Sequence, residues 1–326
     1  MIALPSLLSS AIAQGTVLLY GATGEIITEK SGNLNLGIPG IMYVGAISGV
    51  VGGFLYQNAA IDPLPVLAII IPLISCIIGS LLASLIYGFL TITLKANQNV
   101  TGLALTTFGV GVGNFLGGSI IKLTNSDIPF LSLVDLSVYF QKYIPVADNL
   151  GWFGKIFLRH GFMVYLAVIL AIVASYILNH TRVGLHLRAV GESPATADAA
   201  GINVTAYKYV SICVGGAVAG LGGLYFILDY VNGVWANDGF GDMGWLAIAI
   251  VIFATWKPSF AILGSYLFGF FSVLYNYLKV GMKMIPIMQL IPYAVTIIVL
   301  IAISAMRKRE NQPPASLGLS YFREDR

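Results

Sequence analysis

The sequence predicts an all-α integral membrane protein, a polytopic bundle of about nine transmembrane helices with broken or re-entrant segments. Of its 326 residues, 57% are hydrophobic and only 10% are charged, and the mean hydropathy is +0.87. So little charge cannot solvate a soluble globule of this length. Apolar runs of the length that crosses a bilayer, about 20 residues, recur along the whole chain. We therefore expect one transmembrane domain over residues 1–326.

The apolar runs give the order of the predicted spans. They lie at residues 3–24, 36–56, 64–94, 102–120, 162–178, 207–230, 246–256, 259–279 and 286–306. An Ala-Ile-Ala stretch in the first run is similar to a signal-peptidase site, but no Lys or Arg precedes it and the apolar run continues past it. We therefore expect a helix there and not a cleaved leader.

Two features refine the first four spans. A straight helix over 64–94 would be about 46 Å long, against a hydrocarbon core of about 30 Å, so Pro65 and Pro72 predict a tilted or broken helix. Glycines recur every four residues in the second and fourth runs, which indicates faces where helices approach closely. These glycines are Gly45, Gly49, Gly53, Gly109, Gly113 and Gly117.

Charge beside the spans predicts the orientation. Arg307-Lys308-Arg309 follows the last span, so residues 307–326 are expected to form a cytoplasmic tail. With nine spans the N-terminus then lies outside, 182–205 lies inside, and the polar and aromatic stretch 121–160 is an extracytoplasmic insert on the membrane surface. Similar glycine-rich segments precede a span in each half. They suggest an inverted repeat that relates 25–120 to 207–306, although the sequence identity between the halves is too weak to show it.

The polar stretch 182–205 contains the signals of a very short helix. Ser193 is suited to cap it, Pro194 to begin it and Gly201 to follow its end. A helix of about two turns is not stable alone, so its neighbours must hold it. Its alanines give it a small face that suits a groove in another protein.

Polar side chains near the ends of the spans are candidates to line a substrate path. They are Asn33, Asn35, Gln98, Asn114, Asp242 and Trp245. Alternatives remain open for most of them. The two asparagines after the first span either begin a broken helix beside a cavity or form a turn, and Gln98 either contacts a solute or caps a helix. Asn114 either forms an interhelical hydrogen bond or contacts the pore. Trp245 either stacks on a base or anchors the chain at the membrane interface.

Two of these polar stretches carry a family resemblance. Residues 184–203, GLHLRAVGESPATADAAGIN, resemble the cytoplasmic coupling loop of bacterial ABC-importer permeases, and Glu25 to Gly37 resembles the pattern E-x3-E-[RK]-x-G-x-x-N-L-G of the same group. Segments around Lys95 to Leu103 and Gly239 to Pro258 are similar too. Within the branched-chain amino acid, ribose and nucleoside group, the chain is most similar to the nucleoside and simple-sugar permeases.

The resemblance implies partners and a cargo. An ATPase subunit, which binds ATP and Mg²⁺, would dock on the coupling residues, while this chain holds no cofactor. A second, non-identical permease and a lipid-anchored extracytoplasmic solute-binding protein would complete an importer in the bacterial cytoplasmic membrane. The implied cargo is a nucleoside, with ribose-like sugars or branched-chain amino acids as alternatives. The implied coupling residues are Gly191, Glu192, Ser193, Pro194, Ala195, Asp198, Ala199, Ala200 and Gly201.

Missing motifs exclude other functions. Gly154-Lys155 is followed by Ile156, so the sequence has no phosphate-binding loop for ATP, and it has no zinc, protease or hydrolase motif. We therefore expect no catalytic or metal-ligating residues, and the formal charge of +3 suggests no nucleic-acid partner. An ion-coupled secondary transporter is the remaining alternative. It is disfavoured because we expect no charged residues buried in the spans.

Overall fold

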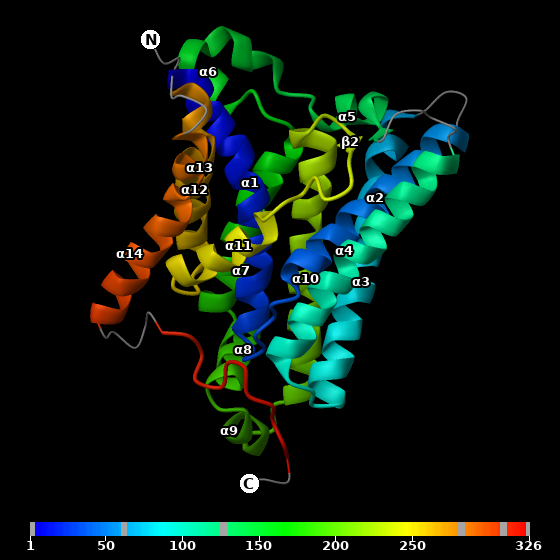
Figure 1. The fold of residues 1–326 in the computed structure, drawn as a ribbon. Coiled ribbons are helices and arrows are strands. Elements are labelled where there is room, and N and C mark those ends of the chain that lie inside the picture. The colour runs from blue at the N-terminus through cyan, green and yellow to red at the C-terminus, as the bar shows by residue number, and fades with distance from the viewer. Residues whose placement is uncertain (1–3, 60–63, 124–129, 279–283, 307–311, 324–326) are drawn as a thin grey trace.

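The structure, a computed structural model, describes residues 4–59, 64–123, 130–278, 284–306 and 312–323. Helices dominate these residues (Figure 1). Within the described ranges, six helices are long and apolar enough to cross a membrane, two of them extended by a π-helical turn, so a helical, multi-pass membrane protein is confirmed. They are α2 (Ile38–Ala59), α3 (Pro65–Gly88) with η1 (Phe89–Thr93), α4 (Gln98–Leu123), α7 (Phe162–His180), α10 (Val204–Tyr225) with η3 (Phe226–Tyr230), and α12 (Pro258–Tyr277).

Helix α1 (Leu4–Glu29) occupies the centre of the bundle. Figure 1 shows it in dark blue between the other helices, and it packs against α7, α10, α11 and α12. From Gln14 to Glu29 every residue except Ile27 is buried. The helix runs five residues beyond the predicted end at 24. It can do so because polar groups at that end find partners inside the protein, as described below.

Helix α3 is continuous across Pro72, so of the two alternatives that the prolines predicted, a tilted or a broken helix, the break is absent. The residues around Pro72 pack on the glycine face of α2, where a Cβ added at Gly49 would lie 3.1 Å from the Pro72 carbonyl oxygen. Close contact of this kind lets a membrane helix accommodate a proline without breaking. The irregularity lies instead at η1, where the Leu94 amide donates to the Phe89 carbonyl (3.0 Å).

The predicted glycine faces are confirmed as packing faces. A Cβ added at Gly45 of α2 would lie 2.7 Å from Gly220 Cα of α10, and one added at Gly109 of α4 would lie 2.6 Å from the Gly40 carbonyl oxygen of α2. No larger residue fits at such distances, so these glycines set how closely α2, α4 and α10 approach.

The last part of the bundle is discontinuous. The run 246–256 forms α11 (Met243–Phe253), which at about 1.5 Å per residue covers about 16 Å, roughly half of a hydrocarbon core. In Figure 1 it lies at mid-height, after a segment that descends from β2 without helix. The chain then continues through α12, α13 (Ile285–Gln289) and α14 (Ile291–Met306). The Arg307-Lys308-Arg309 signal lies outside the described residues.

A short sheet ties the insert 121–160 to the segment before α11. Strand β1 (Leu131–Ser132) pairs antiparallel with β2 (Val234–Trp235), a pairing that the all-α prediction did not include because two-residue strands leave no pattern in the sequence. The insert also contains α5 (Val134–Phe140), η2 (Pro145–Leu150) and α6 (Gly151–Phe157). These elements lie together at the end of the molecule opposite α9 (Figure 1).

Candidate coupling and translocation sites

The predicted coupling segment forms two helices, α8 (Arg182–Glu192) and α9 (Pro194–Ala199), at the end of the bundle opposite the insert (Figure 1). The predicted caps of the second helix are confirmed. Ser193 Oγ accepts the Thr196 amide (3.4 Å), Pro194 is in the first turn, and Gly201 has a φ of +82°. Residues 182–192 were expected to be a loop. They form the helix α8 instead, which Thr181 caps: its Oγ1 accepts the Gly184 amide (3.1 Å).

One side of α9 is buried and the other is open. Ala197 is 3% exposed and lies in a cluster with Val190 and Val204, whereas Ala195 and Ala199, one helical turn apart, are both exposed. Among the other predicted coupling residues Gly191 is buried, Ser193, Pro194 and Asp198 are half-buried, and Glu192, Ala200 and Gly201 are exposed. The helix therefore presents a small, uncovered alanine face.

The tail, residues 312–323, holds the coupling segment in place. The Ser316 amide and hydroxyl both donate to the Gly191 carbonyl (3.0 and 2.6 Å), and the Gly318 amide donates to the Gly32 carbonyl (3.2 Å). The Tyr321 hydroxyl donates to Asp198 Oδ2 (2.9 Å), which also pairs with Arg323 Nε at 3.2 Å. The tail thus connects α9 to the loop between α1 and α2.

Three predicted path residues, Asn33, Asn35 and Gln98, lie together beside that loop, and all are buried. Gln98 Oε1 accepts the Leu34 amide (2.7 Å), and Asn35 Oδ1 accepts the Gly37 amide (2.9 Å). The Asn33 side-chain amide donates to Ser31 Oγ (2.7 Å). The bonds of Asn33 and Asn35 are local, as the turn interpretation expects, whereas Gln98 does not cap α4: it holds the loop after α1, and Asn97 Oδ1 accepts the Val100 amide (3.1 Å) at the start of α4. Asn35 Nδ2 has no partner among the described residues.

Asn114 belongs to a second group, at another depth. Sixteen residues of α4 separate it from Gln98, about 24 Å along the helix. The Tyr43 hydroxyl donates to Asn114 Oδ1 (2.6 Å), the Asn114 side-chain amide donates to Asp238 Oδ1 (2.9 Å), and the Asp238 backbone amide donates to Tyr43 Oη (3.0 Å). These three residues close a ring of hydrogen bonds, which we call the outer polar ring because it lies toward the insert, the part predicted to be extracytoplasmic.

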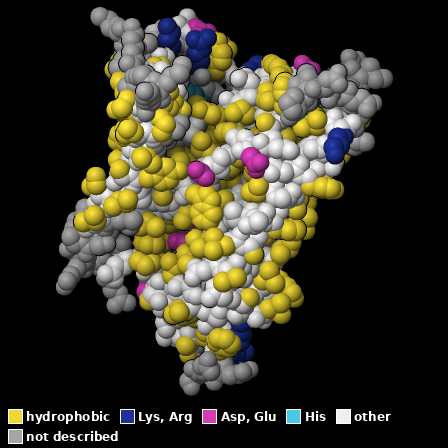
Figure 2. All heavy atoms as spheres, in the orientation of Figure 1, with side chains coloured by type: hydrophobic (Ala, Val, Ile, Leu, Met, Phe, Trp, Pro, Cys, Tyr) yellow, Lys and Arg dark blue, Asp and Glu magenta, His cyan; other side chains and the backbone are white. Residues whose placement is uncertain are grey.

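The remaining two path residues stand at the start of α11. Asp242 is exposed, and its side chain makes no capping bond to the helix. Trp245 is 38% exposed although it follows a non-helical segment inside the bundle. Figure 2 shows acidic side chains surrounded by hydrophobic ones on this face of the molecule. The six predicted residues therefore do not form one site.

Buried charges are the main feature that the sequence did not predict. Glu25 (0% exposed), Glu29 (3%) and Lys208 (3%) are all buried, so the expectation of spans without buried charged residues is wrong. Glu25 Oε1 accepts the Asn35 amide (3.1 Å), and Glu29 accepts a hydrogen bond from the Trp256 indole. The E-x3-E spacing places both carboxylates on one face of α1, and this was the signal available in the sequence.

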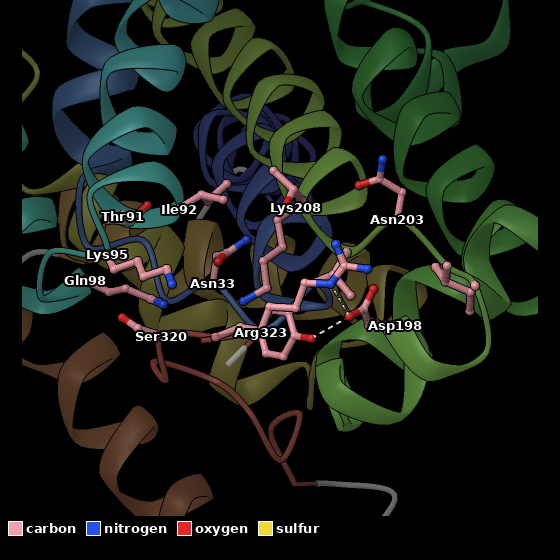
Figure 3. A pocket seen from close by; sticks show the side chains of 15 residues that line it. Asn33, Thr91, Ile92, Lys95, Gln98, Asp198, Asn203, Lys208, Ser320 and Arg323 are labelled. Atoms are coloured by element: carbon pink, nitrogen blue, oxygen red, sulfur yellow. Dashed lines mark hydrogen bonds and ion pairs between the residues drawn. The ribbon is translucent and has the colours of Figure 1, made fainter. Parts of the chain in front are cut away.

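A cavity of about 410 Å³ lies between the tail, α9, and the beginnings of α4 and α10. Figure 3 shows Lys208, Asn33 and Arg323 reaching into this space, with Lys95 and Gln98 to one side. We call it the cytoplasmic pocket, after the side of the membrane on which the sequence predicts residues 182–205 to lie. Sequence reasoning missed it because its walls come from four distant parts of the chain. They include Asn33, Thr91, Ile92, Lys95, Gln98, Asp198, Gly201, Ile202, Asn203, Val204, Thr205, Lys208, Ser320, Tyr321 and Arg323.

Comparison with known proteins agrees with this architecture. Among curated relatives, the nucleoside ABC transporter permease protein NupC of Lactococcus lactis is 32% identical over 311 residues, which cover 90% of each chain. The guanosine ABC transporter permease protein NupQ of Bacillus subtilis is 29% identical over 320 residues, covering 95% of this chain and 94% of NupQ. The permease protein TsgC13 of Haloferax volcanii, whose name refers to glucose, is 32% identical over 272 residues, covering 82% of this chain and 76% of TsgC13.

No solved structure matches the chain. The family model described as "Branched-chain amino acid transport system / permease component" matches residues 7–303, which include all the membrane helices described above. The chain therefore belongs to this family of ABC transporter permeases.

Proposed function

We propose that this chain is the transmembrane subunit of an ATP-driven importer that moves nucleosides into the cell. Two of the three relatives described above, NupC and NupQ, are named as nucleoside or guanosine permeases and align with almost the whole chain. TsgC13, named for glucose, supports a simple sugar as the second candidate. Hydrolysis of ATP takes place in a separate subunit, and this chain itself catalyses no reaction.

The observation that carries the coupling role is the two-sided environment of α9. Its alanine face, Ala195 and Ala199, is exposed, while its opposite side is attached through Ala197 and Asp198 to α8, α10 and the tail. An ATPase that docks on the exposed face would displace the whole attached unit. Because the tail also bonds Gly32, the displacement would reach the end of α1. Motion of packed, hydrogen-bonded elements as a unit is the usual basis of hinge and shear changes.

The proposed translocation face lies at the outer polar ring and the start of α11. A nucleoside is neutral and rich in hydroxyl and amide groups. The Asp238 and Asp242 carboxylates can accept hydrogen bonds from ribose hydroxyls, and the exposed ring of Trp245 can stack on a base. Asn33, Asn35 and Gln98 instead act in the loop at the cytoplasmic end of the path.

The proposed topology has nine passages. Six are the long apolar helices, and the others are α1, α11 with the segment before it, and α13 with α14. The N-terminus then lies outside, and α9 and the tail lie in the cytoplasm. The assembly includes a second, non-identical permease, ATPase subunits and a lipid-anchored binding protein. Within this chain, an inverted repeat relates residues 25–120 to 207–306.

Uptake by the whole system tests the function. Cells carrying this chain with its neighbouring transport genes are compared with cells whose ATPase cannot hydrolyse ATP, using labelled uridine and adenosine. We expect uptake that other nucleosides compete and that disappears with the ATPase variant. Uptake of ribose alone would replace the cargo but keep the ATP-driven role. Uptake that persists without ATP hydrolysis and collapses with an ion gradient would contradict the proposal.

A further inference from the structure

The cytoplasmic pocket is unusually rich in cations for a cavity in this apolar protein. Among the residues that the structure describes, Lys95, Lys208 and Arg323 line it, against a single carboxylate, Asp198. That carboxylate already accepts the Tyr321 hydroxyl and pairs with Arg323. The Asp198 carboxylate therefore neutralises one of the three cations, and the pocket keeps an excess of positive charge.

Lys208 carries the argument furthest. Lys208 is only 3% exposed, and it lines the pocket. Figure 3 shows its side chain directed into the cavity. Its ammonium group makes no hydrogen bond or ion pair to the residues that the structure describes, and the dashed lines of Figure 3 meet only at Asp198. Burying an ammonium group without a partner is costly, since most buried charges in proteins are paired or hydrogen-bonded. An anion in the cavity would supply the missing partner.

Two helix beginnings point the same way. The first residues of α10, Val204 and Thr205, and the first residue of α4, Gln98, all line the pocket. Helix N-termini carry partial positive charge and free amide groups, which favour bound anions. Side-chain groups with donor capacity, Asn33 and Ser320, complete the polar part of the wall.

The charge of the pocket separates it from the translocation face. A nucleoside is neutral, so three cations would contribute nothing specific to holding it. We propose that the cytoplasmic pocket binds a soluble phosphate monoester, and we infer a nucleoside monophosphate as the class. Only the choice of the nucleoside part rests on the proposed function. The reaction that consumes an imported nucleoside by phosphorylating it would produce such an anion on this side of the membrane.

Dimensions and walls agree with that class. A volume of about 410 Å³ is within the range of small-molecule sites, about 300–1,000 Å³, and exceeds what a phosphate ion alone needs. Ile92, Ile202 and Val204 provide an apolar part, and Tyr321 adds an aromatic ring. The bound anion would bridge α10, the start of α4 and the tail that holds α9.

Binding to the purified full-length chain tests the proposal without any transport. The chain is placed in nanodiscs of neutral phosphatidylcholine, and binding of labelled uridine and adenosine monophosphates is measured by equilibrium dialysis. Inorganic phosphate and uridine serve as competitors. We expect saturable binding that phosphate competes and uridine does not. Losing a charge-assisted hydrogen bond in Lys208→Met should weaken it by about tenfold or more.

Matched variants keep the test decisive. Lys208→Arg retains the charge and should bind more tightly than Lys208→Met, and thermal melting of both shows that the fold persists. Lys155→Met removes an exposed lysine at the opposite end and should change nothing. Absence of binding to the wild-type chain, or binding that is unaffected in Lys208→Met, would overturn the proposal. Nucleotide binding by the wild-type chain that disappears when the nanodiscs contain phosphatidylglycerol would also overturn it, because the lipid headgroup would then be the occupant that Lys208 binds. Because nucleoside uptake plays no part, failure here leaves the transport proposal standing.

Discussion

The two polar regions of this protein use the same residue types in opposite ways. At the end of the bundle that carries α9, Asn35 and Gln98 are buried, and they bond the backbone of the loop after α1. In the outer polar ring, Asn114 is half-buried and bonds other side chains beside exposed carboxylates. Amides that hold backbone fix a shape, whereas amides and carboxylates at an accessible surface can exchange partners with a solute. The difference supports the proposed division between a region that transmits movement and one that contacts cargo.

The largest effect is expected from Ala199→Trp. An indole on the exposed alanine face would overpack the groove of a docked partner, which costs about 1–3 kcal/mol, and uptake should fall about tenfold or more. Ala294→Trp puts the same side chain on an exposed position of α14 and should transport normally. Uptake and membrane insertion are measured for both. Normal uptake by the Ala199 variant would remove the distinction between the two regions.

Asn114→Ala removes the three hydrogen bonds that this side chain makes to Tyr43 and Asp238 in the outer polar ring, and it should act on the cargo. Each hydrogen bond contributes about 0.5–1.5 kcal/mol, so we expect the KM for nucleoside uptake to rise about tenfold with a smaller change in maximal rate. Ser119→Ala, on the same helix, removes only a bond to the Phe115 carbonyl within α4 and is the control. Equal KM values for the two variants would contradict a cargo role for the ring.

Loss of the contact between the tail and α9 should have a moderate effect, and this effect should be on thermal stability. Tyr321→Phe removes the hydrogen bond to Asp198, about 1 kcal/mol, and should lower the Tm by about 2 °C. Arg323 is 76% exposed, so its ion pair adds on the order of 0–1 kcal/mol. Tyr176→Phe, at an exposed tyrosine, provides the comparison. If both variants melt alike, the tail does not hold α9 in the way described.

The smallest effect concerns the pH dependence of stability at the end of the bundle that carries the insert. His160, between α6 and α7, is buried, and its Nε2 donates to the Ile156 carbonyl (2.9 Å). Burial lowers its pKa below the ordinary 6.5. As pH falls through that ordinary value, the unfolded chain binds a proton that the folded chain refuses, so stability decreases. Tm measured from pH 7.5 to 5.5 should fall less in His160→Gln than in wild type. An identical slope would exclude this contribution.

The bundle could be predicted because each span carries its own signal. Apolar runs predicted α2, α4 and α10, glycines spaced by four marked the packing faces of α2 and α4, and Ser193 with Gly201 marked the caps of α9. Other features depend on residues far apart in the sequence. Tyr43 and Asp238 complete the ring around Asn114, and nothing near either residue announces it. Lys208 was hidden in an apolar run, and its importance follows only from the cavity that the tail closes.

The buried carboxylates change the argument against an ion-coupled transporter. Its rejection on the sequence rested on spans without buried charge, yet Glu25 and Glu29 are buried in α1. Their oxygens accept hydrogen bonds from the Asn35 backbone amide and the Trp256 indole, so they belong to the same end of the bundle as the tail. The family match to ABC transporter permeases, and not the absence of charge, now disfavours ion coupling.

The most direct test of the central claim is whether a partner ATPase covers the alanine face of α9. Ala199→Cys is introduced into a chain whose Cys76 and Cys213 are replaced by alanine, and a membrane-impermeant maleimide is applied to the purified permease with and without the ATPase. Trp152→Cys, exposed on α6 at the opposite end, is the control. We expect the ATPase to protect position 199 and leave position 152 equally reactive. Equal labelling of position 199 with and without the ATPase would contradict the account.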